Sequence, residues 1–187
     1  IGEVSSKGYP GGLVIVIGRF IFHPLIMSYE STKKILGELN RLLAVDMRKD
    51  MFMSMLVIKW DALKKIFTWT GAGHEHILIY KAKTKKCKTI RAGGIVLGMV
   101  KNSNQFLKEQ QLKLDKGDAI ILYTDGVTEC NDPKGNMLGL KKLVVLVERY
   151  GELPAKEICD SIFNDLVKFM GKSPQYDDIT LVGIKRT

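Results

Sequence analysis

The chain has 187 residues, of which 45% are hydrophobic and 26% are charged, a composition that gives one globular domain enough apolar residues for a core. Its 29 Lys and Arg against 20 Asp and Glu give a net charge of +9, which favours anionic partners without defining a function. The three cysteines form no Cys-x-x-Cys pair, which argues against a disulfide framework or a zinc knuckle and predicts a reducing, cytoplasmic location.

The first quarter of the chain is typical of a short strand followed by two helices. Residues 1–4 read as the end of a strand, and a helix is expected from about Pro10, since proline suits the first helical turn. A second helix is predicted from Ser31 to Met47, where apolar residues recur at spacings of three and four. The apolar segment from Gly12 to Met27 is interrupted by charge and proline and is shorter than the roughly 20 residues that span a membrane. We therefore expect a helix buried inside a soluble domain.

The middle of the chain changes to the alternating pattern of strands. The predicted strands are residues 52–58, 65–70 and 76–80. Their short connections favour antiparallel pairing. Residues 111–114 and 119–123 resemble a further hairpin with Lys116 and Gly117 in its turn. The second strand of that hairpin is apolar throughout and is expected to be central in its sheet.

Helical spacing returns in the last third of the chain. It covers Leu138 to Tyr150 and Pro154 to Met170, and each predicted helix stops at a glycine. A last strand is predicted at residues 179–184. Because strands and helices come in blocks, the pattern favours an α+β layered fold, and we expect residues 1–187 to form a single domain.

Three acidic residues stand at predicted strand ends: Glu3, Asp125 and Asp177. Carboxylates at strand ends can converge on one rim of a sheet, and Mg²⁺ and Mn²⁺ prefer such oxygen ligands. Considered alone, each acid is more typical of a turn, and Asp125 followed by Gly126 is a common turn dipeptide. The surrounding motifs therefore have to decide between a turn and a metal site.

Those motifs resemble a known family. Residues 121–129 (ILYTDGVTE) and residues 177–182 (DDITLV) closely resemble the two C-terminal motifs of the SpoIIE-type phosphatases, a bacterial branch of the PPM family of metal-dependent protein phosphatases. Three further matches, in family order, are GEVSSKG at 2–8, GAGH at 71–74 and GGIVLG at 93–98. On these five motifs the chain is identified as a member of the family. The resemblance implies a layered β-sandwich flanked by helices.

The resemblance also implies a set of metal ligands. Asp125 and Asp177 would bind metal, Glu3 would occupy the position of a bridging aspartate, and the Val4 carbonyl would be a backbone ligand. Glu129 could approach an additional metal. In the family a water bridging two Mn²⁺ or Mg²⁺ ions attacks the phosphorus directly, so no catalytic residue is expected beyond the ligands. A thiol phosphatase is excluded because no cysteine begins a Cys-x₅-Arg loop.

Two residues depart from the family pattern. Glu3 stands where the family has aspartate, and the extra methylene displaces a carboxylate by about 1.5 Å, against a tolerance of roughly 0.2 Å for metal–ligand distances. Ser6 replaces a glycine, which matters if that turn position needs a positive φ. The family's upstream acidic strand does not occur in these residues. We therefore expect an N-terminally truncated domain that binds its two metal ions weakly or not at all.

The resemblance implies dephosphorylation of phosphoserine or phosphothreonine on a regulatory protein of the anti-sigma-factor antagonist type. Glu3 and Ser6 leave an alternative open, a catalytically impaired relative that serves as a regulated protein-binding module. An upstream sensory domain is expected in the full-length chain, and a homodimer is compatible with the sequence. Contact with nucleic acid or membrane is not expected. The basic run from Lys81 to Arg91 lacks interleaved aromatics and is typical of a solvated sheet edge.

Overall fold

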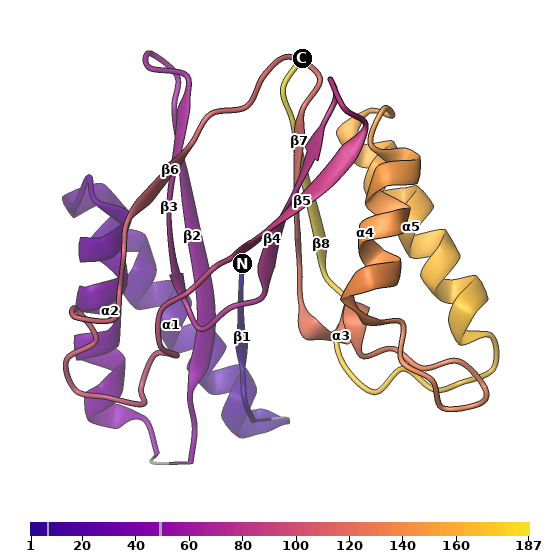
Figure 1. The fold of residues 1–187 in the computed structure, drawn as a ribbon. Coiled ribbons are helices and arrows are strands. Elements are labelled where there is room, and N and C mark those ends of the chain that lie inside the picture. The colour runs from indigo at the N-terminus through magenta and orange to yellow at the C-terminus, as the bar shows by residue number, and fades with distance from the viewer. Residues whose placement is uncertain (7, 49) are drawn as a thin grey trace. The chain divides into compact units, whose positions relative to one another are not determined.

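The computed structural model describes residues 1–6, 8–48 and 50–187. These residues form two compact units, each with its own four-stranded antiparallel sheet and a pair of long helices beside it (Figure 1). The first unit is Ile1–His74 with Ala92–Lys113, and the second is Glu75–Arg91 with Leu114–Thr187. The expected α+β class is confirmed.

The first unit holds the sheet with strand order β1-β2-β3-β6. Its elements are β1 (Gly2–Val4), α1 (Tyr9–Ser28), α2 (Thr32–Asp46), β2 (Met53–Asp61), β3 (Ile66–Ala72) and β6 (Gln110–Leu112). All its strand pairs are antiparallel, and the short connection between β2 and β3 predicts this for that pair. The strand predicted at residues 76–80 does not join them, because it forms β4 (His76–Lys81) of the other sheet. The predicted apolar stripe of α2 forms part of the core, where Leu36 and Leu39 are fully buried. Ser31 starts this helix, because its side chain accepts the Lys34 N–H.

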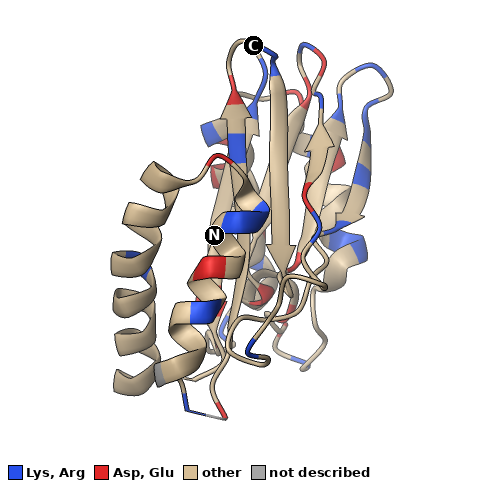
Figure 2. Ribbon diagram, turned by 90° about the vertical axis from the view of Figure 1, so that its left-hand side faces the viewer, with Lys and Arg blue, Asp and Glu red and all other residues tan. Residues whose placement is uncertain are grey.

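The helix α1 corrects the expectation of a buried helix. The buried residues of α1 are Gly11 and Gly18, while Leu13, Phe20 and Met27 are 61%, 76% and 80% exposed. Its length and composition would allow it to cross a membrane, and the core helix of a soluble protein or a signal sequence can have the same length and composition. Only 17% of its most apolar window is buried. One face of the helix, with Gly11, Gly18 and the half-buried Val14, Ile21, Phe22 and Leu25, packs against the core, and the other apolar residues lie outside. Figure 2 shows α1 almost free of charge, next to the charged α2.

The second unit holds the sheet with strand order β5-β4-β7-β8. Its elements are β4 (His76–Lys81), β5 (Lys86–Arg91), β7 (Ala119–Tyr123), α3 (Asp125–Thr128), α4 (Gly139–Tyr150), α5 (Ala155–Met170) and β8 (Leu181–Lys185). β7 lies between β4 and β8 with all its residues buried, so the prediction of a central apolar strand is confirmed. β5 contains half of the basic residues of that run and forms a sheet edge, as expected.

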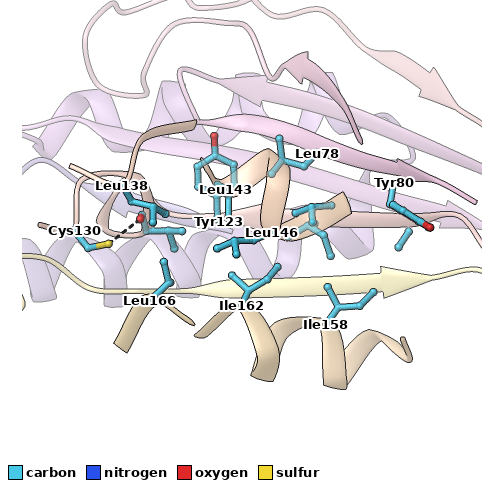
Figure 3. Close-up of a cluster of buried hydrophobic side chains, with 14 of the residues drawn as sticks. Leu78, Tyr80, Tyr123, Cys130, Leu138, Leu143, Leu146, Ile158, Ile162 and Leu166 are labelled. Carbon is cyan, nitrogen blue, oxygen red and sulfur yellow. Dashed lines mark hydrogen bonds between the residues drawn. The ribbon is translucent and has the colours of Figure 1, made fainter. Parts of the chain in front are cut away.

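The core of the second unit lies between its sheet and the helix pair α4 and α5. Figure 3 shows Tyr123 of β7 with Leu143 of α4 and Ile162 of α5 in one cluster of side chains. Each of these three side chains is 1% exposed or less. The apolar residues of α5 recur at Ile158, Ile162 and Leu166, a spacing of four that places them on one face of the helix. This packing fixes the end of β7, from which the acidic motif begins.

One predicted hairpin is wrong. Residues 111–114 and 119–123 do not pair, because β6 joins β3 in the first sheet while β7 joins β4 and β8 in the second. A turn does form between them, with Gly117 at a φ of 86°. The buried carboxylate of Asp118 accepts the Ala82 N–H from the turn between β4 and β5. This bond ties the turn to the second sheet, where β7 pairs with β4 on one side and β8 on the other and so has no free edge for the preceding segment.

Candidate metal centre

Asp125 stands where β7 ends and α3 begins. The Glu129 N–H donates to the Asp125 carbonyl at 2.8 Å, which closes a single helical turn. The Thr128 hydroxyl donates to the same carbonyl at 3.1 Å. The Asp125 side chain therefore projects from a rigid junction between the central strand and a short helix.

Thr124 joins the two C-terminal acidic motifs. Its hydroxyl donates to the Asp178 carbonyl at 2.8 Å and accepts the Thr180 N–H at 3.0 Å, while its own N–H donates to the Thr180 carbonyl. These bonds hold the segment before β8 against the end of β7. Thr124 is not among the predicted site residues, although a hydroxyl residue directly after an apolar strand and before an acid is a signal for such a role.

The structure brings the carboxylates of Asp125 and Asp177 together, with one oxygen of each within 4.8 Å of the other. The Oδ1 atom of Asp125 is buried and has no hydrogen-bond donor among the described residues. The Oδ1 atom of Asp177 accepts the Asp178 N–H at 2.8 Å. Two partly buried carboxylates so close to each other repel unless a cation or a proton neutralises them. The pair therefore fits a divalent cation that prefers oxygen ligands.

Gly126 permits the close approach of these two motifs. A Cβ atom at this position would overlap the Asp178 carbonyl oxygen and would lie 3.3 Å from the Asp177 carbonyl carbon. Both neighbours are backbone atoms, which cannot rotate out of the way as a flexible side chain could. A glycine is therefore required for close packing here, although its dihedral angles are ordinary.

We expect Gly126→Ala to lower the free energy of unfolding by about 1–3 kcal/mol, because the methyl group must separate the two segments. The same shift should weaken Mn²⁺ binding. Urea denaturation and calorimetric titration measure the two effects. Gly12→Ala is the matched control, since nothing lies within 4 Å of its Cβ position and alanine favours a helix. Equal behaviour of the two variants would contradict the packing argument.

The other predicted ligands are Glu3, Val4 and Glu129, and the structure gives the position of each. Glu3 and Val4 lie on β1 of the first unit, half-buried, opposite Ser54 and Met53 of β2. Glu129 follows α3 and is exposed. The roles of these three residues as metal ligands stay predictions.

The glycine that Ser6 replaces is not needed for its backbone conformation. Among the described non-glycine residues, positive φ values occur at Lys65 and Lys85, and Ser6 is not one of them. The left-handed conformation of this turn falls on Gly8, with a φ of 73°. The replacement of glycine by Ser6 therefore places no strain on the backbone at this position.

A second family motif ends at His74, which is almost fully buried. Its Nδ1 atom is hydrogen-bonded with the Ser54 hydroxyl at 3.0 Å. Since Ser54 is the register partner of Glu3, this bond holds the part of β2 that lies beside the first acidic motif. His74 thus has a structural partner within its own unit.

Comparison with solved structures defines the class of fold. The SiaA-PP2C domain of Pseudomonas aeruginosa superposes with a TM-score of 0.84 at 19% identity, over 100% of this chain and 73% of that one. The RsbU and RsbW domains of Rv1364c from Mycobacterium tuberculosis give a TM-score of 0.81 at 22% identity, over 99% and 50%. At these identities the likeness shows the fold, which is that of the PP2C-type phosphatase domains.

Comparison at the level of sequence identifies the family. The family model for Stage II sporulation protein E (SpoIIE) matches residues 1–187, and the chain belongs to this family. Phosphoserine phosphatase RsbU of Bacillus subtilis (strain 168) is 30% identical over 186 residues, which are 100% of this chain and 54% of that protein. The chain thus spans about half the length of this curated relative.

Proposed function

We propose that this chain is the catalytic part of a metal-dependent phosphatase that removes phosphate from phosphoserine or phosphothreonine of a regulatory protein. The observation that carries the proposal is the buried Asp125 Oδ1, which lacks a donor among the described residues and belongs to a carboxylate paired with Asp177. Family membership supports the reaction class. The similarity to a phosphoserine phosphatase supports the type of substrate.

In this proposal Asp125 and Asp177 hold Mn²⁺ or Mg²⁺, and Glu3 with the Val4 carbonyl belongs to the same ligand set. Glu129 serves an additional ion. When bound, such ions activate water and neutralise charge on the transferring phosphoryl group. The chain's own contribution is to orient the two aspartates, which the hydrogen bonds of Thr124 achieve from both motifs.

The cysteines support a mechanism without a thiol nucleophile. Burial raises the pKa of Cys87 to about 12, and the nearby Glu148 adds to this effect. Burial also raises the pKa of Cys130 and of Cys159. All three thiols therefore stay protonated at neutral pH, and a thiolate is the form that attacks phosphorus.

The proposed substrate is a phosphorylated protein of the anti-sigma-factor antagonist type, in the cytoplasm. The relative RsbU and the solved protein that combines RsbU and RsbW domains favour this class of partner. The net charge of +9 suits a phosphorylated, acidic protein. An upstream sensory domain and a homodimer stay predictions.

The full-length protein tests the proposal in an assay with a small aryl phosphate. We expect hydrolysis with Mn²⁺ or Mg²⁺ and its complete loss with excess EDTA, because the aspartate pair then lacks its cation. Restoring activity with Mn²⁺ controls for unfolding. Stable binding of a phosphoprotein without any hydrolysis, at all metal concentrations, would favour the impaired binding module instead.

A further inference from the structure

An open groove of about 610 Å³ runs between α4 and α5 of the second unit. Its apolar lining consists of Leu138, Val145, Leu146 and Phe169. Val145 of α4 is 52% exposed, whereas Leu143, Leu146 and Val147 of the same helix are buried. The groove therefore offers an apolar surface to another molecule.

The charges along this α4–α5 groove are mostly positive. Lys141, Lys142, Arg149 and Lys168 line it, against the single acid Asp165. Four cations and one anion leave an excess of three positive charges. The groove thus combines an apolar surface with a basic border, and this combination restricts what can occupy it.

The single acid of the groove is already neutralised within the protein. Asp165 accepts a hydrogen bond from the Tyr150 hydroxyl at 2.7 Å and pairs with Arg149 at 3.4 Å and Lys168 at 3.3 Å. The hydrogen bond from Tyr150 is the largest cause that lowers its pKa, and the two cations add to it. Asp165 is therefore ionised at neutral pH and does not repel an acidic partner strongly.

We propose that the α4–α5 groove binds an acidic amphipathic helix of a partner protein. Along α4 the lining residues recur at Lys142, Val145 and Arg149, with spacings of three and four, and Leu138 directly precedes the helix. Such a stripe is what one helix presents to another that packs along it. The apolar side chains of the partner would cover Val145, and its carboxylates would meet the lysines and arginine.

A nucleic acid fits the groove less well. Its phosphates would meet the cations but would leave the apolar lining without a partner, and the Phe169 ring already packs under Lys142, whose Nζ lies 4.5 Å from the ring centre. Base stacking needs an open aromatic face. The groove shares no residue with the aspartate pair. That the bound helix belongs to a phosphoprotein substrate or regulator rests on the proposed function, whereas the binding itself does not.

The experiment uses the 187-residue chain without metal and a fluorescein-labelled peptide as long as α5, with leucines at helical spacing on one face and glutamates on the other. We expect saturable binding by fluorescence anisotropy that weakens as salt increases. The double substitution Lys141→Glu with Lys142→Glu should weaken binding about tenfold or more, since two attractive contacts become repulsive. Val145→Glu should weaken it similarly.

Matched variants distinguish binding in the groove from a general effect of net charge. Lys83→Glu with Lys116→Glu makes the same change of net charge on exposed turns of the same unit, and Val167→Glu changes an exposed valine outside the groove. Binding should survive both changes. Thermal denaturation checks that every variant folds.

Three results would overturn the proposal: no binding of the acidic peptide, equal binding of a lysine-containing counterpart, or tighter binding of a single-stranded oligonucleotide that Val145→Glu leaves unchanged. Hydrolysis of an aryl phosphate is measured separately on the same variants in the full-length protein. It should stay unchanged, because no groove residue belongs to the metal centre. Loss of the proposed phosphatase function and loss of the docking surface are thereby distinguished.

Discussion

Asp125→Asn and Asp177→Asn are each expected to abolish Mn²⁺-dependent hydrolysis by the full-length protein while leaving it folded. An amide is a neutral and weaker ligand than a carboxylate, so the site loses a negative charge and binds the cation less tightly. Because a metal supplies several kcal/mol of charge stabilisation in the transition state, we expect the rate to fall about a thousandfold or more. Steady-state hydrolysis of an aryl phosphate at saturating Mn²⁺ measures this fall.

Stability provides the control for these two variants. Without metal, removing one charge relieves the repulsion between the carboxylates of Asp125 and Asp177, so the free energy of unfolding should stay equal or rise. Asp160→Asn alters an exposed acid on α5 and should change neither activity nor metal affinity. Full activity in either site variant would show that the metal ligands are assigned wrongly.

Most elements of the fold follow from short-range sequence patterns, and the two errors have physical causes. The hairpin ending in β7 is predicted from its turn, but β7 pairs on both edges with β4 and β8, which lie far from it in the sequence. The exposure of α1 does not follow from its average hydrophobicity, because this average does not show that only one face, with Gly11 and Gly18 buried, packs on the core. Both cases depend on contacts that periodicity does not encode.

In the candidate site, the candidate metal ligands could be predicted from the sequence, but the residues that position them could not. Asp125 and Asp177 were found because their motifs have a distinctive composition, and the structure brings their carboxylates together. The residues that create this proximity, Thr124 and Gly126, were not found, since their importance lies in hydrogen bonds and a close backbone approach between the motifs. Supporting residues of this kind have no sequence period of their own.

Mn²⁺ affinity is expected to be weak in the 187-residue chain and to rise when two ligand contributions are restored. Glu3 is one methylene longer than the family's aspartate, and the acidic strand that the family carries ahead of this motif is not among these residues. Mg²⁺ and Mn²⁺ favour near-octahedral oxygen geometry, so a site formed mainly by Asp125 and Asp177 should leave the ion mostly hydrated.

Supplying the acidic strand ahead of Ile1 together with Glu3→Asp should tighten Mn²⁺ binding at least about tenfold, because both changes add or reposition a carboxylate ligand. Glu3→Gln in the same extended chain is the matched control, since it keeps the length of the side chain and removes its charge. It should bind Mn²⁺ more weakly than the extended chain with its native Glu3 or with Glu3→Asp. Calorimetric titration gives the affinity and the number of ions. Tight binding of two Mn²⁺ ions by the unmodified 187-residue chain would mean that Glu3 already serves as a full ligand and that the acidic strand is dispensable.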